Sequence, residues 1–131
     1  EQLNIDIEIV ECAIVRGEDG LALSSRNELL TPEHRAAAPH IYATIKQCAE
    51  KMNSMTPQEL TEWVVATIDS NPLLKTIYFE AVDARTMQKV ENWSDSERIQ
   101  GCCAIQAGEI RLIDNIKIIL QLLKQLKSYC I

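Results

Sequence analysis

Helical and strand patterns occupy separate parts of this 131-residue sequence, and this separation most limits the folds open to the chain. Apolar residues recur at helical spacing between residues 31 and 71, whereas alternating apolar residues predominate between residues 75 and 116. Sequences that group helices and strands in this way are typical of α+β domains. We therefore predict a small α+β domain in which two or more helices pack on a three-stranded antiparallel sheet.

Each predicted helix begins after a threonine that is followed by proline. Thr31 and Thr56 can accept hydrogen bonds from free backbone N–H groups, and proline is favoured at the first helical position. Glu59 completes a capping-box pattern with Thr56, and Pro39 predicts a kink because it removes a backbone hydrogen bond. The apolar residues expected in the core are Ala37, Ile41, Ile45, Leu60, Val64 and Ile68.

Three strands are predicted after the second helix, over residues 75–84, 99–107 and 110–116. The short turn around Gly108 predicts that the last two strands form a hairpin. In the first of these strands, alternation places Ile77, Phe79 and Ala81 on one face. Residues 5–10 also alternate, but they have no obvious partner nearby, so we expect them to belong to a sheet whose other strands are missing.

Charge and cysteine content exclude several classes of protein. The net charge of −6 argues against a nucleic-acid-binding surface, and no apolar run approaches the roughly 18 residues of a membrane span. The five cysteines have neither CxxC pairs nor zinc-site spacing, so we predict no metal site. Reduced, mostly buried thiols in a cytoplasmic protein are favoured over a catalytic cysteine. The cysteines are Cys12, Cys48, Cys102, Cys103 and Cys130.

The stretch DGLALSSRN, residues 19–27, concentrates hydrogen-bond donors between two ordered segments. Taken alone, its residue types favour a polar loop that caps the following helix. The alternative is a phosphate-binding loop, because serine hydroxyls and an arginine suit phosphate oxygens. The remaining motifs of the chain decide between these interpretations.

Four segments together resemble the pantoate–β-alanine ligase family, in the order in which they occur there. They are VRGEDGLALSSRN (residues 15–27), LTPEHR (30–35), YFEAVDA (78–84) and GEIRLIDN (108–115). The resemblance implies an AMP-forming ligase that condenses pantoate with β-alanine. ATP, with Mg²⁺, would activate pantoate as pantoyl adenylate with release of pyrophosphate, and the β-alanine amine would then displace AMP.

The resemblance also implies how the chain is organised. Residues 1–14 would be the last strand of an absent N-terminal Rossmann-like nucleotide-binding domain, and residues 15–131 a C-terminal lid domain. This fragment would be inactive alone, and the full enzyme would be a cytoplasmic homodimer without nucleic-acid or membrane partners. A non-catalytic interaction or oligomerisation domain of the same fold, using the apolar tail at 117–131, is the alternative.

Nucleotide-binding residues are carried over from the family motif by position. Val15 would meet the adenine through its backbone, and the second ATP-binding block would consist of Leu23, Ser24, Ser25 and Arg26. The serines would donate to phosphate oxygens and Arg26 would offset their charge, which stabilises the transition state at the α-phosphorus.

No catalytic residue is assigned within this chain. For Arg111 and Asp114 we favour a structural ion pair or turn hydrogen bond over catalysis. For His34 and His40 we expect solvent-facing side chains.

Overall fold

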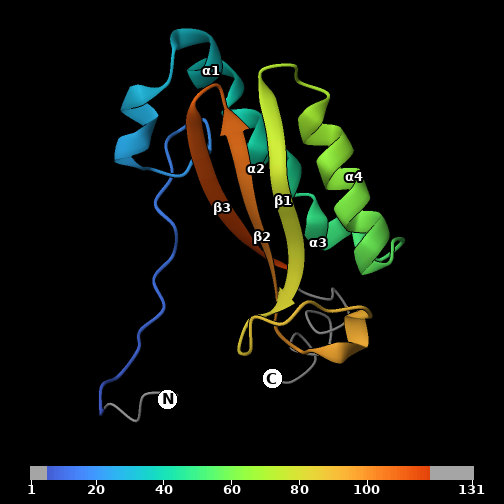
Figure 1. The fold of residues 1–131 in the computed structure, drawn as a ribbon. Coiled ribbons are helices and arrows are strands. Elements are labelled where there is room, and N and C mark those ends of the chain that lie inside the picture. Colours follow the sequence, from blue (N-terminus) through green and yellow to red (C-terminus); the bar gives the residue numbers. More distant parts are fainter. Residues whose placement is uncertain (1–5, 119–131) are drawn as a thin grey trace.

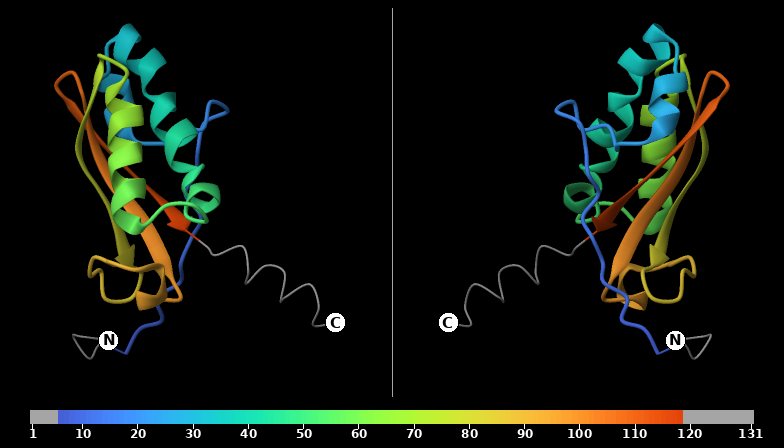
Figure 2. Two further views of the ribbon diagram at one scale, coloured as in Figure 1. Left: turned by 90° about the vertical axis from the view of Figure 1, so that its right-hand side faces the viewer. Right: turned by 90° about the vertical axis from the view of Figure 1, so that its left-hand side faces the viewer.

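A computed structural model describes residues 6–118 and confirms the α+β architecture. The strands form one antiparallel sheet in the order β1-β2-β3, and the helices lie on one of its faces (Figures 1 and 2). The helical elements are η1 (Ser25–Leu29), α1 (Pro32–Ala37), α2 (Pro39–Ile45), α3 (Cys48–Lys51), α4 (Pro57–Asp69) and η2 (Trp93–Asp95). The strands are β1 (Leu74–Asp83), β2 (Ile99–Ala107) and β3 (Ile110–Ile118).

Both predicted helix starts are confirmed by their hydrogen bonds. Thr31 Oγ1 accepts from the backbone N–H of His34 at 3.3 Å. Thr56 Oγ1 accepts from the Glu59 N–H at 3.2 Å, and the Glu59 carboxylate accepts from the Thr56 N–H at 2.8 Å. Pro39 begins α2, so the expected kink is a break between two short helices.

The core lies between the helical layer and the sheet. Its predicted helical members are all buried, and Ile45, Leu60, Val64 and Ile68 are 0% exposed. Phe79, Ile105 and Leu112 meet them from the three strands. Because α4 contacts β1 and α2 contacts β3, the helices hold the full width of the sheet in place.

The predicted facing of β1 is wrong at Ile77, which is 50% exposed. In the register with β2, Thr76 lies opposite Ile105 and Tyr78 opposite Ala104, so Ile77 is the extra residue of a β-bulge. The bulge shifts the alternation by one residue, and Phe79 and Ala81 then face the core as expected.

Residues 6–15 form neither helix nor strand and are exposed, and they leave the layered body as an extended segment (Figure 1). The expected strand over 5–10 therefore has no partner within the described residues, and its assignment to a sheet of a preceding domain stays a prediction. The predictions for the apolar tail after Ile118 lie outside the described residues. Within residues 6–118, no helix has the length and apolar character needed to cross a membrane.

Candidate functional site

The segment 15–27 folds back on itself beside β3. The Leu23 N–H donates to the Val15 carbonyl and the Gly17 N–H to the Leu21 carbonyl, both at 2.9 Å. Gly20 makes the turn with a φ of +85°, a backbone conformation that favours glycine. The fold therefore brings Val15 and Leu23, two of the predicted nucleotide contacts, side by side.

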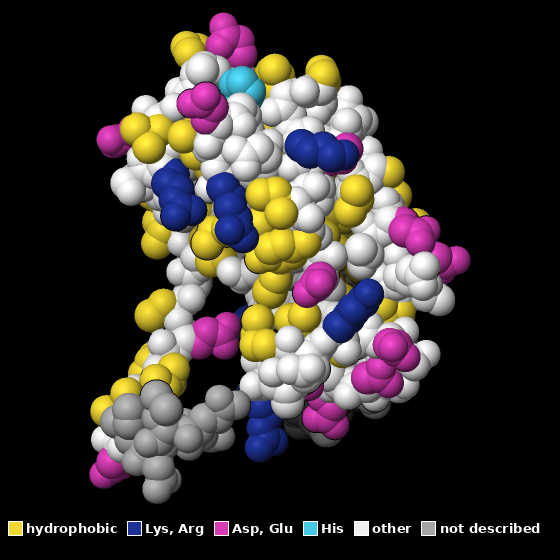
Figure 3. Space-filling model, in the orientation of Figure 1, with side chains coloured by type: hydrophobic (Ala, Val, Ile, Leu, Met, Phe, Trp, Pro, Cys, Tyr) yellow, Lys and Arg dark blue, Asp and Glu magenta, His cyan; other side chains and the backbone are white. Residues whose placement is uncertain are grey.

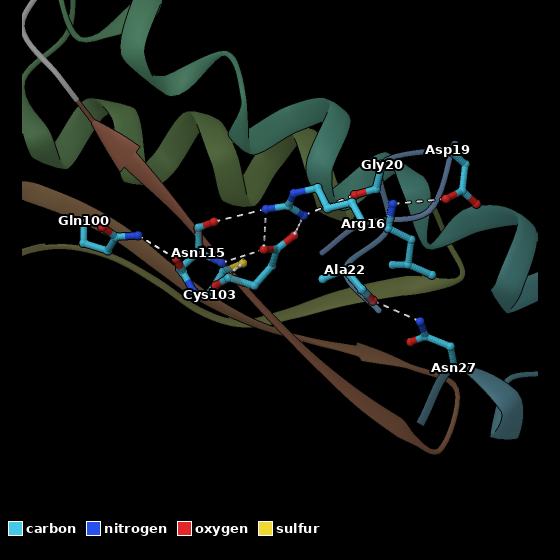
Figure 4. A network of polar contacts seen from close by, with 10 residues as sticks. Arg16, Asp19, Gly20, Ala22, Asn27, Gln100, Cys103 and Asn115 are labelled. Atoms are coloured by element: carbon cyan, nitrogen blue, oxygen red, sulfur yellow. Dashed lines mark hydrogen bonds and ion pairs between the residues drawn. The ribbon is translucent and has the colours of Figure 1, made fainter. Parts of the chain in front are cut away.

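Arg16 fastens this segment to β3 through Asp114 (Figure 4). Its Nη1 and Nη2 lie 2.6 and 2.9 Å from Asp114 Oδ2 and Oδ1, a bidentate pair. The same guanidinium donates to the carbonyls of Gly20 at 3.1 Å and Asn115 at 3.3 Å. The Arg16 and Asp114 side chains are 15% and 5% exposed, so the ion pair is largely desolvated.

For Asp114 a structural ion pair or turn hydrogen bond was expected, without a named partner, and the ion pair with Arg16 confirms this expectation. Hydrogen bonding to Asp114 raises the pKa of Arg16, against the effect of burial, so the guanidinium stays charged at physiological pH. Its two members are 98 residues apart in the sequence. We assign the pair a structural function, the attachment of segment 15–27 to the sheet.

Tyr42 of α2 completes the environment of Arg16. The guanidinium carbon lies 3.8 Å from the centre of the Tyr42 ring. Tyr42 also packs on Gly20, since a Cβ placed there would overlap Tyr42 Cδ1. Arg16 is thus held between a carboxylate, two carbonyls and an aromatic ring, which fixes the entry to the serine–arginine stretch.

The three residues Ser24, Ser25 and Arg26 lie at the start of η1, and all are exposed. Ser24 Oγ accepts a hydrogen bond from the Arg26 N–H at 3.2 Å, as the cap of η1. The Arg26 side chain reaches β3, where Nη1 donates to the Arg111 carbonyl at 3.3 Å. The stretch is therefore both a helix cap and an exposed group of donors beside β3.

A pocket of about 310 Å³ opens between η1, α2 and β3. Ser24 and Arg26 line it, whereas Val15, Leu23 and Ser25 do not. The other lining residues are Leu21, Ala22, Asn27, Ile41, Arg111, Leu112, Ile113 and Asp114. The pocket combines an apolar floor with polar and cationic groups, a composition common in ligand sites.

Asn27 is a pocket residue that was not singled out from the sequence. Its Nδ2 donates to the Ala22 carbonyl at 3.0 Å, while its buried Oδ1 has no hydrogen-bond partner among the described residues. A buried acceptor without a donor is costly. Asn27 could have been noticed because it directly follows the serine–arginine stretch. Asparagine is also a common turn residue, however, so the sequence did not distinguish a ligand-binding function from a turn function.

The histidines do not face solvent freely, in contrast to the expectation. His40 Nε2 lies 2.9 Å from the Thr67 carbonyl, and His34 Nδ1 lies 2.7 Å from Thr31 Oγ1. Both side chains are partly buried and join neighbouring elements. Neither lines the pocket.

Neither the cysteines nor the acidic residues form a reactive or metal-binding cluster in residues 6–118. Burial raises the pKa of both Cys48 and Cys103 to about 12, so these thiols remain protonated. In this range, no group of three or more His, Cys, Asp or Glu side chains is arranged to hold a metal ion.

The fold and the pocket define a small α+β domain that presents a serine–arginine loop at a basic pocket. Residues 1–117 match the family model described as pantoate-beta-alanine ligase, and the chain belongs to this family.

Relatives of known sequence are similar over most of this chain. It is 45% identical to a pantothenate synthetase of Porphyromonas gingivalis over 115 residues, which cover 88% of the chain and 41% of that protein. It is 46% identical to a pantothenate synthetase of Bacteroides thetaiotaomicron over 116 residues, with the same coverage of 88% and 41%. The chain thus spans about two fifths of the length of these curated relatives.

Solved structures of the family have the same fold. A pantothenate synthetase from Thermus thermophilus matches with a TM-score of 0.80 and 31% identity, over 90% of this chain and 42% of that one. A pantoate-beta-alanine ligase from Francisella tularensis, solved in complex with Beta-gamma ATP and Beta-alanine, matches with a TM-score of 0.53 and 29% identity, over 88% of this chain and 35% of that one.

Proposed function

We propose that this chain is the ATP-contacting C-terminal lid domain of a pantoate–β-alanine ligase. In this proposal, residues 15–131 close over a nucleotide held by a Rossmann-like domain, and residues 1–14 supply the last strand of that domain. The observation that carries the proposal is the position of Ser24 and Arg26 in a family motif, exposed at one pocket.

The proposed reaction has two steps. A pantoate carboxylate oxygen attacks the α-phosphorus of ATP, which forms pantoyl adenylate and breaks the bond to pyrophosphate. The β-alanine amine then attacks the acyl carbon, AMP leaves, and the amide of pantothenate remains. Since negative charge builds up on the phosphate oxygens in the first step, preorganised donors lower its barrier.

The residues of this chain would serve binding and charge stabilisation in that first step. Ser24 and Ser25 would donate hydroxyl hydrogens to phosphate oxygens, and Arg26 would supply its planar fork. Val15 and Leu23 would border the nucleotide through their paired backbones. No side chain of the described residues is assigned as acid, base or nucleophile.

Mg²⁺ would accompany ATP, where it offsets charge on the phosphates. The described residues do not fit a protein-borne site for it, because Asp114, the acidic residue at the pocket, is already bound by Arg16. For the complete enzyme we propose ATP, pantoate and β-alanine as ligands. We also propose a homodimer in the cytoplasm, without a nucleic-acid or membrane partner.

An NMR titration of the chain with Mg-ATP tests the proposal. We expect amide shifts at Val15 and at residues 20–27, and weaker binding in Arg26→Ala. Arg85→Ala is the matched control, since Arg85 is exposed in the turn after β1 and does not line the pocket. An Arg26→Ala variant that binds ATP as well as Arg85→Ala does would contradict the assignment.

A non-catalytic interaction domain is the second candidate, and the outer face of the sheet favours it. Figure 3 shows a hydrophobic patch on this face, where Ile77, Tyr78 and Ile113 are 50%, 38% and 63% exposed. If association is the function, Ile77→Ser should lower the sedimentation coefficient of the chain and leave its ATP response unchanged, because Ile77 does not line the pocket. If the ligase assignment holds, the Arg26 variant should instead show the defect.

A further inference from the structure

We propose that Arg111 of β3 is a second guanidinium for the nucleotide's polyphosphate, acting as a pair with Arg26. This inference rests on the proposed ligase function and extends its nucleotide site from the serine–arginine loop to the sheet. Arg111 belongs to GEIRLIDN, the last of the four family-like segments, whereas the phosphate contacts expected from the sequence lie only in the first.

The two arginines meet at the rim of one pocket. Arg26 Nη1 lies 3.3 Å from the backbone oxygen of Arg111, so the guanidinium of Arg26 rests on the strand that carries Arg111. Both residues line the pocket together with Ser24, and both are exposed. A ligand in this pocket would therefore meet cations from η1 and from β3.

Neither arginine is neutralised by an ion pair within the described residues. Four ion pairs form in this part of the chain, and they use Arg16, Arg35, Lys75 and Lys117. Asp114 lines the same pocket, but both of its carboxylate oxygens accept hydrogen bonds from Arg16. The pocket lining therefore carries two arginines without a counter-charge in the described residues, which favours an anion as its ligand.

The charge of the site favours a polyphosphate over a single carboxylate. Two guanidinium groups each offer a planar fork that suits phosphate oxygens, and together they match a ligand with more than one negative charge. The chain as a whole carries a net charge of −6, so it has no general basic surface to attract anions. Anions should therefore bind at the arginines of the pocket rather than over the general surface of the chain.

Asn27 favours a nucleotide over an inorganic phosphate as the physiological ligand. Its buried Oδ1 is an acceptor without a partner in the described residues, and it lies at the same pocket. A nucleotide brings hydrogen-bond donors, the ribose hydroxyls and the adenine amino group, whereas fully ionised phosphate brings none. The pocket thus offers cations for the phosphates, and the Asn27 amide, whose oxygen is buried in the unliganded fold, would turn towards the pocket to accept from the nucleoside.

The test is a set of NMR titrations of the 131-residue chain and three variants, Arg26→Ala, Arg111→Ala and the control Arg85→Ala. The probes are ATP, pyrophosphate, AMP and β-alanine. We expect Arg111→Ala to weaken ATP and pyrophosphate binding by about threefold to tenfold, the range for exposed charge-assisted hydrogen bonds. AMP should lose less than pyrophosphate. Arg111→Lys should recover part of the loss, since it restores the charge without the fork.

The outcomes separate this inference from the proposed function. If Arg26→Ala loses ATP affinity and Arg111→Ala matches the Arg85→Ala control, the inference fails and the ligase-lid assignment stands. If AMP or β-alanine binding falls as much as pyrophosphate binding in Arg111→Ala, the polyphosphate assignment is wrong. If ATP shifts no pocket amide of the unsubstituted chain, both proposals fail. The amide spectrum of each variant without ligand reports whether the fold is intact.

Discussion

Removal of Arg16 should destabilise this domain far more than removal of an exposed arginine. In Arg16→Ala, the Asp114 carboxylate, whose side chain is 5% exposed in the unsubstituted chain, loses both guanidinium hydrogen bonds. Breaking a buried ion pair by removing one partner costs about 3–5 kcal/mol, because the remaining charge is left uncompensated. Since Arg16 itself is 15% exposed, water can reach the vacated position, and we expect a loss of about 3 kcal/mol.

Urea denaturation followed by circular dichroism measures this loss. A domain of ordinary stability has about 5–15 kcal/mol, so a loss of about 3 kcal/mol moves the midpoint visibly. Arg35→Ala is the matched control, because the Arg35–Asp19 pair is 43% and 35% exposed and such pairs contribute about 0.2–1 kcal/mol. Equal losses in the two variants would refute the reasoning that burial makes the Arg16 pair expensive to break.

A double variant separates the unpaired charge from the lost packing. Arg16→Met with Asp114→Leu removes both charges and keeps similar volumes, and buried ion pairs replaced in this way often cost little. We expect the double variant to be more stable than Arg16→Ala. If it is no more stable than Arg16→Ala, the stranded carboxylate does not account for the loss, because both variants lack the hydrogen bonds from Arg16 to the Gly20 and Asn115 carbonyls.

Three further changes test other parts of the fold. Gly20→Ala should cost about 2 kcal/mol or more, seen as a lower melting temperature, because φ is +85° and the added Cβ would overlap Tyr42; an unchanged melting temperature would contradict this. Thr56→Ala should cost about 1 kcal/mol in urea denaturation through loss of the α4 cap, whereas Thr56→Ser should be neutral. A thiol reagent at pH 8 should modify exposed Cys12 and spare Cys48, whose pKa burial raises to about 12, as mass spectrometry of peptides reports. Raising the pH from 8 to 10 should also leave Cys48 unmodified in the folded chain, because burial raises the pKa of its thiol to about 12. Modification of Cys48 at pH 10 would indicate local opening of the fold.

Local patterns predicted much of the fold, because its helix starts and its hairpin depend on residues close in sequence. Thr31, Thr56 and Pro39 act within one turn of themselves, so their effects were readable from single stretches. The bulge at Ile77 was not readable, since alternation gives the facing of a strand but not the position of an extra residue. It depends on the register with β2, which is a tertiary property.

The candidate site was predicted in part for the same reason. Ser24 and Arg26 belong to a compact motif and do meet at a pocket. The bond between Arg16 and Asp114 joins residues 98 positions apart, and no local pattern pairs one arginine with one aspartate over that distance. The structural ion pair expected for Asp114 is present, but its partner Arg16 could not be named, since Arg16 lies in a distant segment of the chain.

The hydrogen bonds from Arg26 to the Arg111 carbonyl and from Arg16 to the Asn115 carbonyl also affect how copies of this chain behave at high concentration. β3 is an edge strand of the sheet, and strand edges with free carbonyls invite pairing between molecules. Arg26 binds the carbonyl of Arg111 and Arg16 binds the carbonyl of Asn115, so two edge carbonyls of β3 are already occupied by side chains of segment 15–27. Segment 15–27 therefore covers part of the β3 edge and should reduce aggregation. If it detached, the exposed carbonyls of β3 could pair with a strand of another molecule.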